Sequence, residues 1–255
     1  MSVLATDLRY ALRRMVRSPG FTIIALLSLA VGIGANASIF AVVGGFLFNE
    51  KPYQDPEELV EVYVFVDVFP YAPLSIPDYR DVREASTEVF QEMGAAGFGF
   101  AQIDYGDRVD NVLAELVTGT WFPVLGLAPS VGRTLLPEDD RTPGGHFVVM
   151  LGHSFWEQEF GGDPGVVGRT LRINGHGYEV VGVASPDYEG LIPGVSPSVL
   201  APLSMAREIL QGVSDPFEAR GTQSFFAKAR LRPGVSLEQA EASLTGTASH
   251  LRETY

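Results

Sequence analysis

The amino-acid sequence predicts an α+β domain that is anchored by a single helix spanning a membrane. The first observation behind this fold class is an apolar run at residues 21–48 that contains no charged residue. The second is the rest of the chain, where strand-like and helix-like patterns are mixed without the regular alternation of a βαβ protein. We therefore expect three parts: an N-terminal segment (1–20), a transmembrane helix (21–48) and a mixed α+β domain (51–255).

The apolar run is long enough to cross a bilayer, which requires roughly 20 residues for a core about 30 Å thick. Its 28 residues would extend about 42 Å as a helix, so the helix must tilt or project beyond the bilayer. Small residues recur at every fourth position in two rows, Ala30, Gly34 and Ser38, and Ala37, Ala41 and Gly45. Such rows allow close packing between membrane helices, and the amide of Asn36 is suited to bonding a neighbouring helix. The alternative is that alanine and glycine are simply common in membrane spans.

A cleaved signal peptide is a second interpretation of the same run, because Ala35-Asn36-Ala37 has the A-x-A pattern of a cleavage site. However, hydrophobicity continues beyond this point to Phe48, and the preceding region is about 20 residues long. The Arg13-Arg14 pair lacks the flanking pattern of a twin-arginine signal. The sequence therefore favours a retained anchor.

Residues 2–17 predict an amphipathic helix at the membrane surface, since Leu4, Leu8 and Leu12 share one face. Ser18-Pro19-Gly20 is expected to end it. Four arginines against one aspartate give residues 1–48 a charge of +3. Since the whole chain has a net charge of −13, residues 49–255 carry −16. Positive residues stay inside, which places the N-terminus in the cytoplasm and the acidic domain outside. The arginines that set this topology are Arg9, Arg13, Arg14 and Arg17.

Short-range patterns define the elements of the domain. Asn174-Gly175 between two strand patterns predicts a tight hairpin, and Gly106-Asp107 predicts another. Ser236 and Gln239 form a capping box before a C-terminal helix. The expected strands are Leu59–Val66, Phe98–Tyr105, Arg108–Leu116, His146–Leu151, Thr170–Ile173, Tyr178–Val183 and Phe225–Leu231, and the expected short helices are Ile76–Ala85, Thr120–Leu125 and Ser154–Phe160.

The strand at Leu59–Val66 is apolar on nearly both faces, so we expect it to be covered and paired on both edges. The amphipathic strand at Phe225–Leu231 is its expected partner. This pairing would make the middle of the domain an insertion between the two ends.

Composition and motifs exclude several kinds of chemistry. The acidic domain lacks the basic face that nucleic-acid binding requires, and without cysteine there is no disulfide or thiolate metal site. There is no P-loop, so the chain is not expected to bind ATP. His153 and Glu157 are spaced for one helix face but lack a third ligand, and Glu138-Asp139-Asp140 is expected to be a solvated loop. We expect no catalytic residue, no cofactor and no metal.

Five segments in order carry a resemblance to one family: LRYALRRMVRSPGFTIIALLSLAVGIGANASIF, PYQDPEELV, GTWFPVLGLAPSVGRTLLPEDD, VVMLGHSFWEQEFGGDPGVVGRTLRINGHGYEVVGVA and ARLRPGVSLEQAEASL. They resemble the N-terminal part of MacB-type ABC transporter permeases, and more specifically the duplicated orphan permeases of that family. The segments span most of the chain. Residues 60–110 are less distinctive.

This resemblance implies a periplasmic core domain with a porter-like part (about 51–120 and 220–255) and an inserted part (about 121–219). It implies a place in the inner (plasma) membrane, single-pass as given, and a role in transmembrane transport such as efflux. The implied partners are the lipid bilayer, further transmembrane helices of a permease, a separate cytoplasmic ATPase subunit and a periplasmic adaptor.

The chain stops at Tyr255, before the later spans of such permeases, so we interpret it as a permease subunit or an N-terminal fragment of one. The alternatives are a stand-alone membrane-tethered binding or scaffold protein of the envelope, and a membrane-anchored hydrolase.

Overall fold

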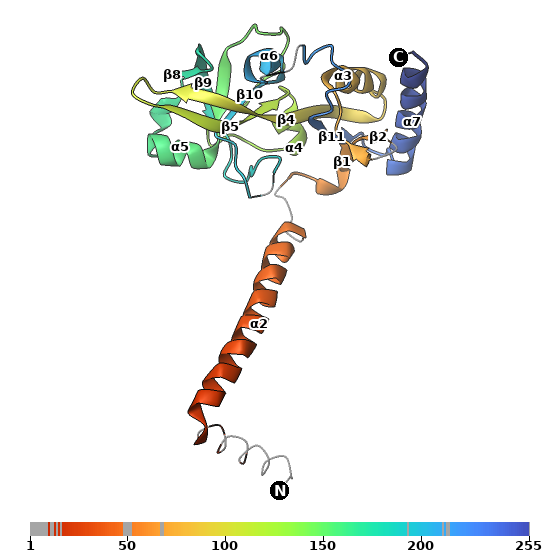
Figure 1. The fold of residues 1–255 in the computed structure, drawn as a ribbon. Helices are drawn as coiled ribbons and strands as arrows, with labels where there is room; N and C mark the ends of the chain where they lie inside the picture. Colours follow the sequence, from red (N-terminus) through yellow and green to blue (C-terminus); the bar gives the residue numbers. More distant parts are fainter. Residues whose placement is uncertain are drawn as a thin grey trace. The chain divides into compact units, whose positions relative to one another are not determined.

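The computed structural model describes residues 10, 13, 15, 17–47, 53–66, 69–192, 194–210, 212 and 215–254. The chain divides into two compact units, Met1–Glu50 and Lys51–Tyr255. The first contains the helix α2, and the second contains the domain (Figure 1).

Helix α2 runs from Pro19 to Leu47, close to the bounds expected from the apolar run. A proline is tolerated in the first turn of a helix, where its missing N–H has no partner to lose. Within the part of the chain that the structure describes, α2 is the one helix long and apolar enough to cross a membrane, and none of its span Pro19–Ser38 is buried inside the protein. The predicted surface helix at 1–20 falls mostly on residues outside the described ranges.

The domain is built on one large mixed sheet. Among the described residues its strands follow the order β1-β11-β4-β5-β10-β7-β9-β6, with β8 pairing β4 and β9. β10 is parallel to β5 and β7 is parallel to β9, whereas the other pairs are antiparallel. The strands are β1 (Leu59–Val62), β4 (Phe90–Asp104), β5 (Val109–Val117), β6 (Val131–Gly132), β7 (Val148–Leu151), β8 (Thr170–Ile173), β9 (His176–Val183), β10 (Val199–Pro202) and β11 (Phe225–Leu231).

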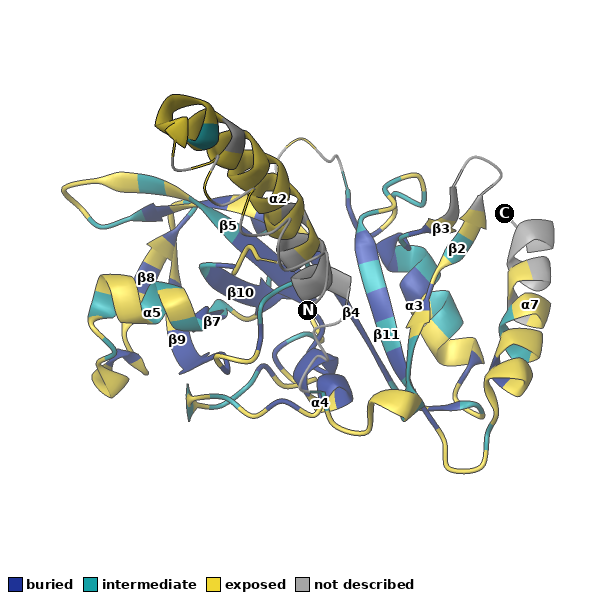
Figure 2. Cartoon of the chain, turned by 90° about the horizontal axis from the view of Figure 1, so that it is seen from below, coloured by how far each residue is buried: buried dark blue, intermediate teal, exposed yellow. Residues whose placement is uncertain are grey.

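Both faces of the central strands of this sheet are buried, so neighbouring residues of one strand enter different cores. In β4, Ala95 belongs to one apolar cluster and Ala96 to the other. Helix α4 packs on the face of Ala96, and its Trp121 is 1% exposed. In Figure 2 the central strands of the sheet are coloured mostly as buried (dark blue). The helices and turns are α3 (Ile76–Ala85), α4 (Trp121–Leu125), α5 (His153–Phe160), α6 (Ala206–Ile209), α7 (Leu237–Thr254), and the 3-10 turns Pro56–Glu58, Pro164–Val166 and Leu203–Met205.

Most of the predicted elements are confirmed. Asn174 and Gly175 have φ of 50° and 83°, which is the geometry of the expected hairpin turn. The capping box is formed, since Ser236 accepts from the Gln239 N–H and the Gln239 side chain accepts from the Ser236 N–H. The expected pairing of the first and last strands is also confirmed, with Val62 opposite Ala227.

The single strand expected at Leu59–Val66 is wrong. β1 ends at Val62, and Val64–Val66 forms β2, which pairs with β3 (Phe69–Ala72) in a separate two-stranded sheet. The expectation that the first strand is paired on both edges is also wrong, because β1 lies at the end of the described sheet beside β11. Val62 is buried, whereas Glu61 and Tyr63 on either side of it are exposed. The strand therefore has one solvated face and needs cover on only one side.

Candidate functional site

The arginines predicted to set the topology lie in the first unit. Arg13 and Arg17 are exposed. Arg9 and Arg14 lie outside the described residues.

The two rows of small residues lie on α2, as the sequence predicts. Ala30, Gly34, Ala37 and Ser38 are exposed. The side-chain nitrogen of Asn36 donates to the carbonyl of Gly32, one turn earlier (3.1 Å), so part of its polarity is satisfied within the helix. Ala41 and Gly45 also fall within the bounds of α2.

The segment that follows the membrane helix, residues 53–58, is called the exit segment. Its backbone is hydrogen-bonded to other elements of the domain. The N–H of Gln54 donates to the carbonyl of Leu125, at the end of α4 (3.1 Å). The guanidinium of Arg230, on β11, donates to the carbonyls of Gln54 (2.7 Å) and Val124 (2.8 Å). The Arg230 side chain is only 11% exposed, so one buried cation joins the exit segment to both β11 and α4.

Local geometry leaves little freedom at this junction. Gly126 has φ of 70°, and a Cβ at this position would lie 2.3 Å from the Cβ of Gln54, so only glycine fits. Asp55 has φ of 43°, a left-handed conformation that is uncommon for a residue other than glycine. Arg230 also donates to the Asp55 carbonyl (3.3 Å) and lies 3.7 Å from the Glu58 carboxylate. These contacts hold the strained backbone in place.

A buried carboxylate lies beneath the same region. Glu115, on β5, is 0% exposed, and it accepts from the Tyr188 hydroxyl (2.6 Å) and the Leu191 N–H (2.7 Å). The Tyr188 hydroxyl accepts in turn from the Trp121 indole (3.0 Å). Burial raises the pKa of Glu115, and the two hydrogen bonds oppose that rise. Tyr53 of the exit segment packs against this cluster, and burial raises its pKa to about 12.

The acidic run at 138–140 is not the solvated loop expected from sequence. Arg133 donates to both oxygens of Asp139 (2.5 and 3.1 Å), which is 7% exposed. The Asp140 carboxylate accepts from the Ser204 N–H (2.6 Å), and burial raises its pKa to about 6. Only Glu138 of the three remains exposed. The partners of Asp139 are nearby in the chain, Arg133 and the Leu136 N–H, whereas the partner of Asp140, Ser204, lies 64 residues later and could not be read from the local sequence.

His153 and Glu157, noted in the sequence, both lie on α5. The Nε2 of His153 lies 3.6 Å from Glu157, and its Nδ1 lies 3.1 Å from the Ser130 hydroxyl. Both ring nitrogens therefore have protein neighbours. Within the described ranges, no group of three or more histidine, aspartate or glutamate side chains is arranged to hold a metal ion.

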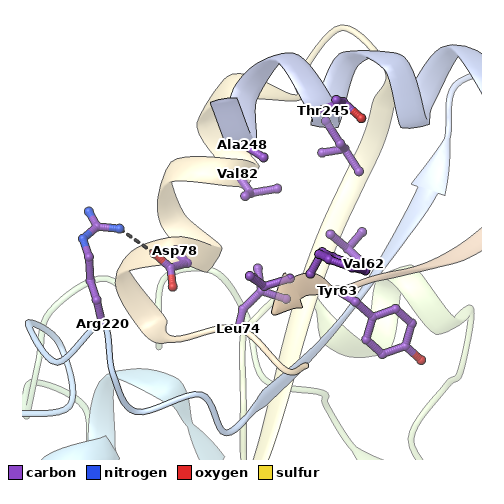
Figure 3. Close-up of a pocket in the computed structure, with 11 residues that line it drawn as sticks. Val62, Tyr63, Leu74, Asp78, Val82, Arg220, Thr245 and Ala248 are labelled. Atoms are coloured by element: carbon purple, nitrogen blue, oxygen red, sulfur yellow. Dashed lines mark hydrogen bonds and ion pairs between the residues drawn. The ribbon is translucent and has the colours of Figure 1, made fainter. Parts of the chain in front are cut away.

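A cleft of about 430 Å³ lies between β1, β2, α3 and α7. Figure 3 shows Val82 of α3 and Ala248 of α7 on one side, with Leu74 and Val62 opposite. Arg220 and Asp78 form an ion pair at one end (2.6 Å). No local sequence pattern marks this cleft, because residues 62–82 form it together with Arg220 and residues 244–248.

An apolar helix long enough to cross a membrane precedes an α+β domain whose first strand pairs with a late one. The sequence matches the family model of the MacB-like periplasmic core domain over residues 22–247. This match covers most of the chain, so the protein belongs to that family. The family is a component of transporter permeases and not a typical enzyme family.

Two solved structures share this fold. The periplasmic region of MacB from Actinobacillus actinomycetemcomitans has a TM-score of 0.55 at 20% identity, over 76% of this chain and 82% of that one. A domain of a putative permease protein from Porphyromonas gingivalis has a TM-score of 0.51 at 17% identity, over 71% and 73%. The extracellular domain of the noncanonic ABC-type transporter YknZ from Gram-positive bacteria has a TM-score of 0.48 at 16% identity, over 72% and 88%. A search of curated proteins finds no match.

Proposed function

We propose that this chain is a permease subunit, or the N-terminal part of one, in an ABC-type transporter. A separate cytoplasmic ATPase would drive conformational change in the periplasmic domain, which passes it to the substrate or to a periplasmic adaptor. The observation that carries this proposal is the family match, which begins inside α2 at residue 22 and continues into α7. Helix and domain therefore belong to one family pattern.

The exit segment supports a coupling role. A displacement of the membrane helix can act on the domain only if the connecting chain is held firmly. Arg230 supplies that hold with three backbone hydrogen bonds from a nearly buried position. Hydrogen bonds to a charged donor are stronger than those between neutral groups.

The topology and the packing face belong to the same proposal. Arg9, Arg13, Arg14 and Arg17 would keep the N-terminus in the cytoplasm, in accord with the positive-inside rule. The rows of Ala30, Gly34 and Ser38, and of Ala37, Ala41 and Gly45, would pack against further helices of a permease, with Asn36 beside them.

We also propose the division of the domain into a porter-like part (about 51–120 and 220–255) and an inserted part (about 121–219). The position of β11 between β1 and β4 supports it, because residues from both ends of the domain form one block of strands. The sheet continues from this block through β5 into β10, β7 and β9, so the inserted part would extend the porter-like sheet.

The test is isolation of the gene product from its own membranes with an affinity tag at the N-terminus, added at the chromosomal locus. The proposal expects co-isolation of a P-loop ATPase. In a Gly34→Leu variant, whose side chain fills the helix face, the amount of co-isolated ATPase should fall at least fivefold. In Leu27→Ile, on the same helix, that amount should be unchanged. Isolation of the chain with no ATPase and no other helical membrane protein would overturn the proposal in favour of a stand-alone tethered binding protein.

A further inference from the structure

A second hollow lies beside α3, on a different face of that helix from the cleft. Two adjoining pockets of about 390 Å³ and 280 Å³ share the side chains of Arg83, Asp140 and Arg141, and Arg80 lines the larger one. Small-molecule sites span about 300–1,000 Å³, so the space suits a small ligand. These four side chains define what we call the arginine pocket.

The charge of the arginine pocket is opposite to that of the domain. Residues 49–255 carry a net charge of −16, yet the pocket is lined by three arginines and one carboxylate, which leaves a net charge of +2. Arg80 and Arg83 lie three residues apart on α3, so they are neighbours on the helix surface. Arg141 approaches from the loop between β6 and β7. Two separate elements therefore bring positive charge to one point of an acidic domain.

The arginines are held only weakly by other groups. Arg83 lies 3.5 Å from Glu92 and Arg141 lies 3.2 Å from Glu138, in pairs whose side chains are 41–70% exposed. Exposed ion pairs of this kind contribute little to stability, and neither glutamate lines the pocket. Arg80 lies over a phenylalanine ring and forms no ion pair within the part of the chain that the structure describes. An anion can therefore replace these neighbours.

The single carboxylate of the pocket does not neutralise the arginines. The Asp140 carboxylate accepts from the Ser204 N–H (2.6 Å). Among the described residues, none of the three arginines forms an ion pair with Asp140. Its negative charge is thus directed to the backbone, and the guanidinium groups keep donors for a ligand.

We propose that the arginine pocket binds a dianionic phosphate group, either free or carried by a small molecule. Guanidinium groups present paired N–H donors that match the oxygens of phosphate. Two negative charges also equal the net charge of +2 on the lining residues. This proposal goes beyond the function proposed above and does not depend on it.

The experiment is calorimetric titration of the full chain in dodecyl maltoside micelles, which contain no phosphate. Three titrants share a sugar ring and differ in charge: glucose (neutral), glucuronate (one negative charge) and glucose 6-phosphate, which is nearly dianionic at about pH 7.5. Inorganic phosphate, the fourth titrant, distinguishes a free phosphate from a carried one. Glucose 6-phosphate, inorganic phosphate or both should bind saturably, with a Kd of about 1 mM or lower. Glucuronate should bind at least about tenfold more weakly, and glucose should not bind.

Removal of one guanidinium should weaken binding by about tenfold or more, because charge-assisted hydrogen bonds are lost. Arg83→Gln on α3 and Arg141→Gln on the loop test this from two elements. Arg172→Gln is the matched control, because Arg172 is exposed on β8, 3.8 Å from Asp104, and it should leave binding unchanged. Glu138→Gln should instead strengthen binding, since it removes a carboxylate that competes for Arg141. Unaltered circular dichroism shows that a variant is folded.

Four results would overturn the proposal. The first is no saturable binding of either glucose 6-phosphate or inorganic phosphate, and the second is glucuronate binding as tightly as they do. The third is unchanged binding in folded Arg83→Gln and Arg141→Gln, or an equal loss in Arg172→Gln, which would indicate a general effect of charge. The fourth is a Glu138→Gln variant that binds more weakly than the native chain.

Discussion

Two regions of the domain are packed in different ways: the closed end, around β5, β10 and β7, and the cleft end, around β1, β2, α3 and α7. Around β5, β10 and β7 both faces are covered, and Leu116, Met150 and Leu200 are fully buried. Around β1 and β2 one face is covered by α3 and α7, with the cleft between these helices, and the rings of Tyr63 and Phe65 are exposed to solvent. The first end is closed in the manner of a protein core, whereas the second retains space and solvent-exposed apolar surface.

This difference indicates a division of labour. Regions with dense apolar burial open only with the whole domain, whereas sparsely covered elements open locally at lower free energy. The end with β5, β10 and β7 is suited to act as a scaffold. The end with β1, β2 and α7 carries both the exit segment and the cleft, so it is suited to respond to the membrane helix or to a ligand.

Removal of residues 222–255 should have the largest effect. It deletes β11, which lies between β1 and β4 in the sheet, together with α7. The shortened chain should lose cooperative unfolding of the domain, because the sheet loses an internal strand and a core layer. Thermal unfolding followed by circular dichroism tests this, with removal of residues 253–255 as the control. A cooperative transition at an unchanged temperature would show that the C-terminal part is peripheral.

Single substitutions should distinguish the two ends. Trp121→Ala in the closed end should lower the free energy of unfolding by about 3–5 kcal/mol, because it leaves a cavity and removes the bond to Tyr188. Tyr71→Ala at the cleft end, where the side chain is 74% exposed, should cost less than about 1 kcal/mol. Urea unfolding of both variants provides the measurement. Equal losses would contradict the difference between the two ends.

Arg230→Met should loosen the exit segment. It removes the charged donor from the carbonyls of Gln54 and Val124 and should cost about 1–3 kcal/mol. Hydrogen exchange should accelerate at residues 53–62. Arg232→Met is the matched control, because Arg232 is exposed and donates to the single carbonyl of Thr87, and it should leave that exchange unchanged. Identical exchange in the two variants would remove the proposed role of Arg230.

Asp140→Asn should alter the pH dependence of stability by a smaller amount. Burial raises the pKa of Asp140 to about 6, so between about pH 4 and 6 the folded state binds more protons than the unfolded state. The contribution of Asp140 to stability therefore grows as the pH falls through this window and is lost above it. The free energy of unfolding of the variant, minus that of the native chain, should be on the order of 2 kcal/mol lower at pH 4 than at pH 7. A difference that does not change with pH would contradict this assignment.

The sequence predicted the elements whose signals are local. Asn174-Gly175, the Ser236–Gln239 box and the apolar run of α2 each carry their own geometry, and all three form as expected. The beginning of β4 was missed by eight residues, because Gly94-Ala95-Ala96-Gly97 has no β-branched or aromatic side chain. The structure gives the reason: a Cβ at Gly97 would lie 2.6 Å from the Phe225 ring. Small residues there reflect the close approach of β11, which is information from far along the chain.

The functional features depend even more on distant partners. In the sequence, Arg230 falls on the polar side of the amphipathic strand Phe225–Leu231. In the structure it donates to the carbonyl of Gln54 in the exit segment, 176 residues earlier. The cleft combines residues from 62 to 248, and no local pattern marks it. The rows of small residues on α2 lie within a single helix, so their four-residue spacing can be seen in the sequence, and their role in packing stays a prediction.

The most direct test of the account is hydrogen exchange of the full chain in membranes with its ATPase, compared without nucleotide and after trapping with ATP and vanadate. The account predicts that trapping changes exchange at residues 53–62 and along β2 and α7, and leaves β5, β7 and β10 unchanged. Arg230→Met should reduce the change in the domain while ATP is still hydrolysed. Exchange that is identical with and without trapping throughout residues 51–255 would contradict the claim that this domain receives the work of the ATPase.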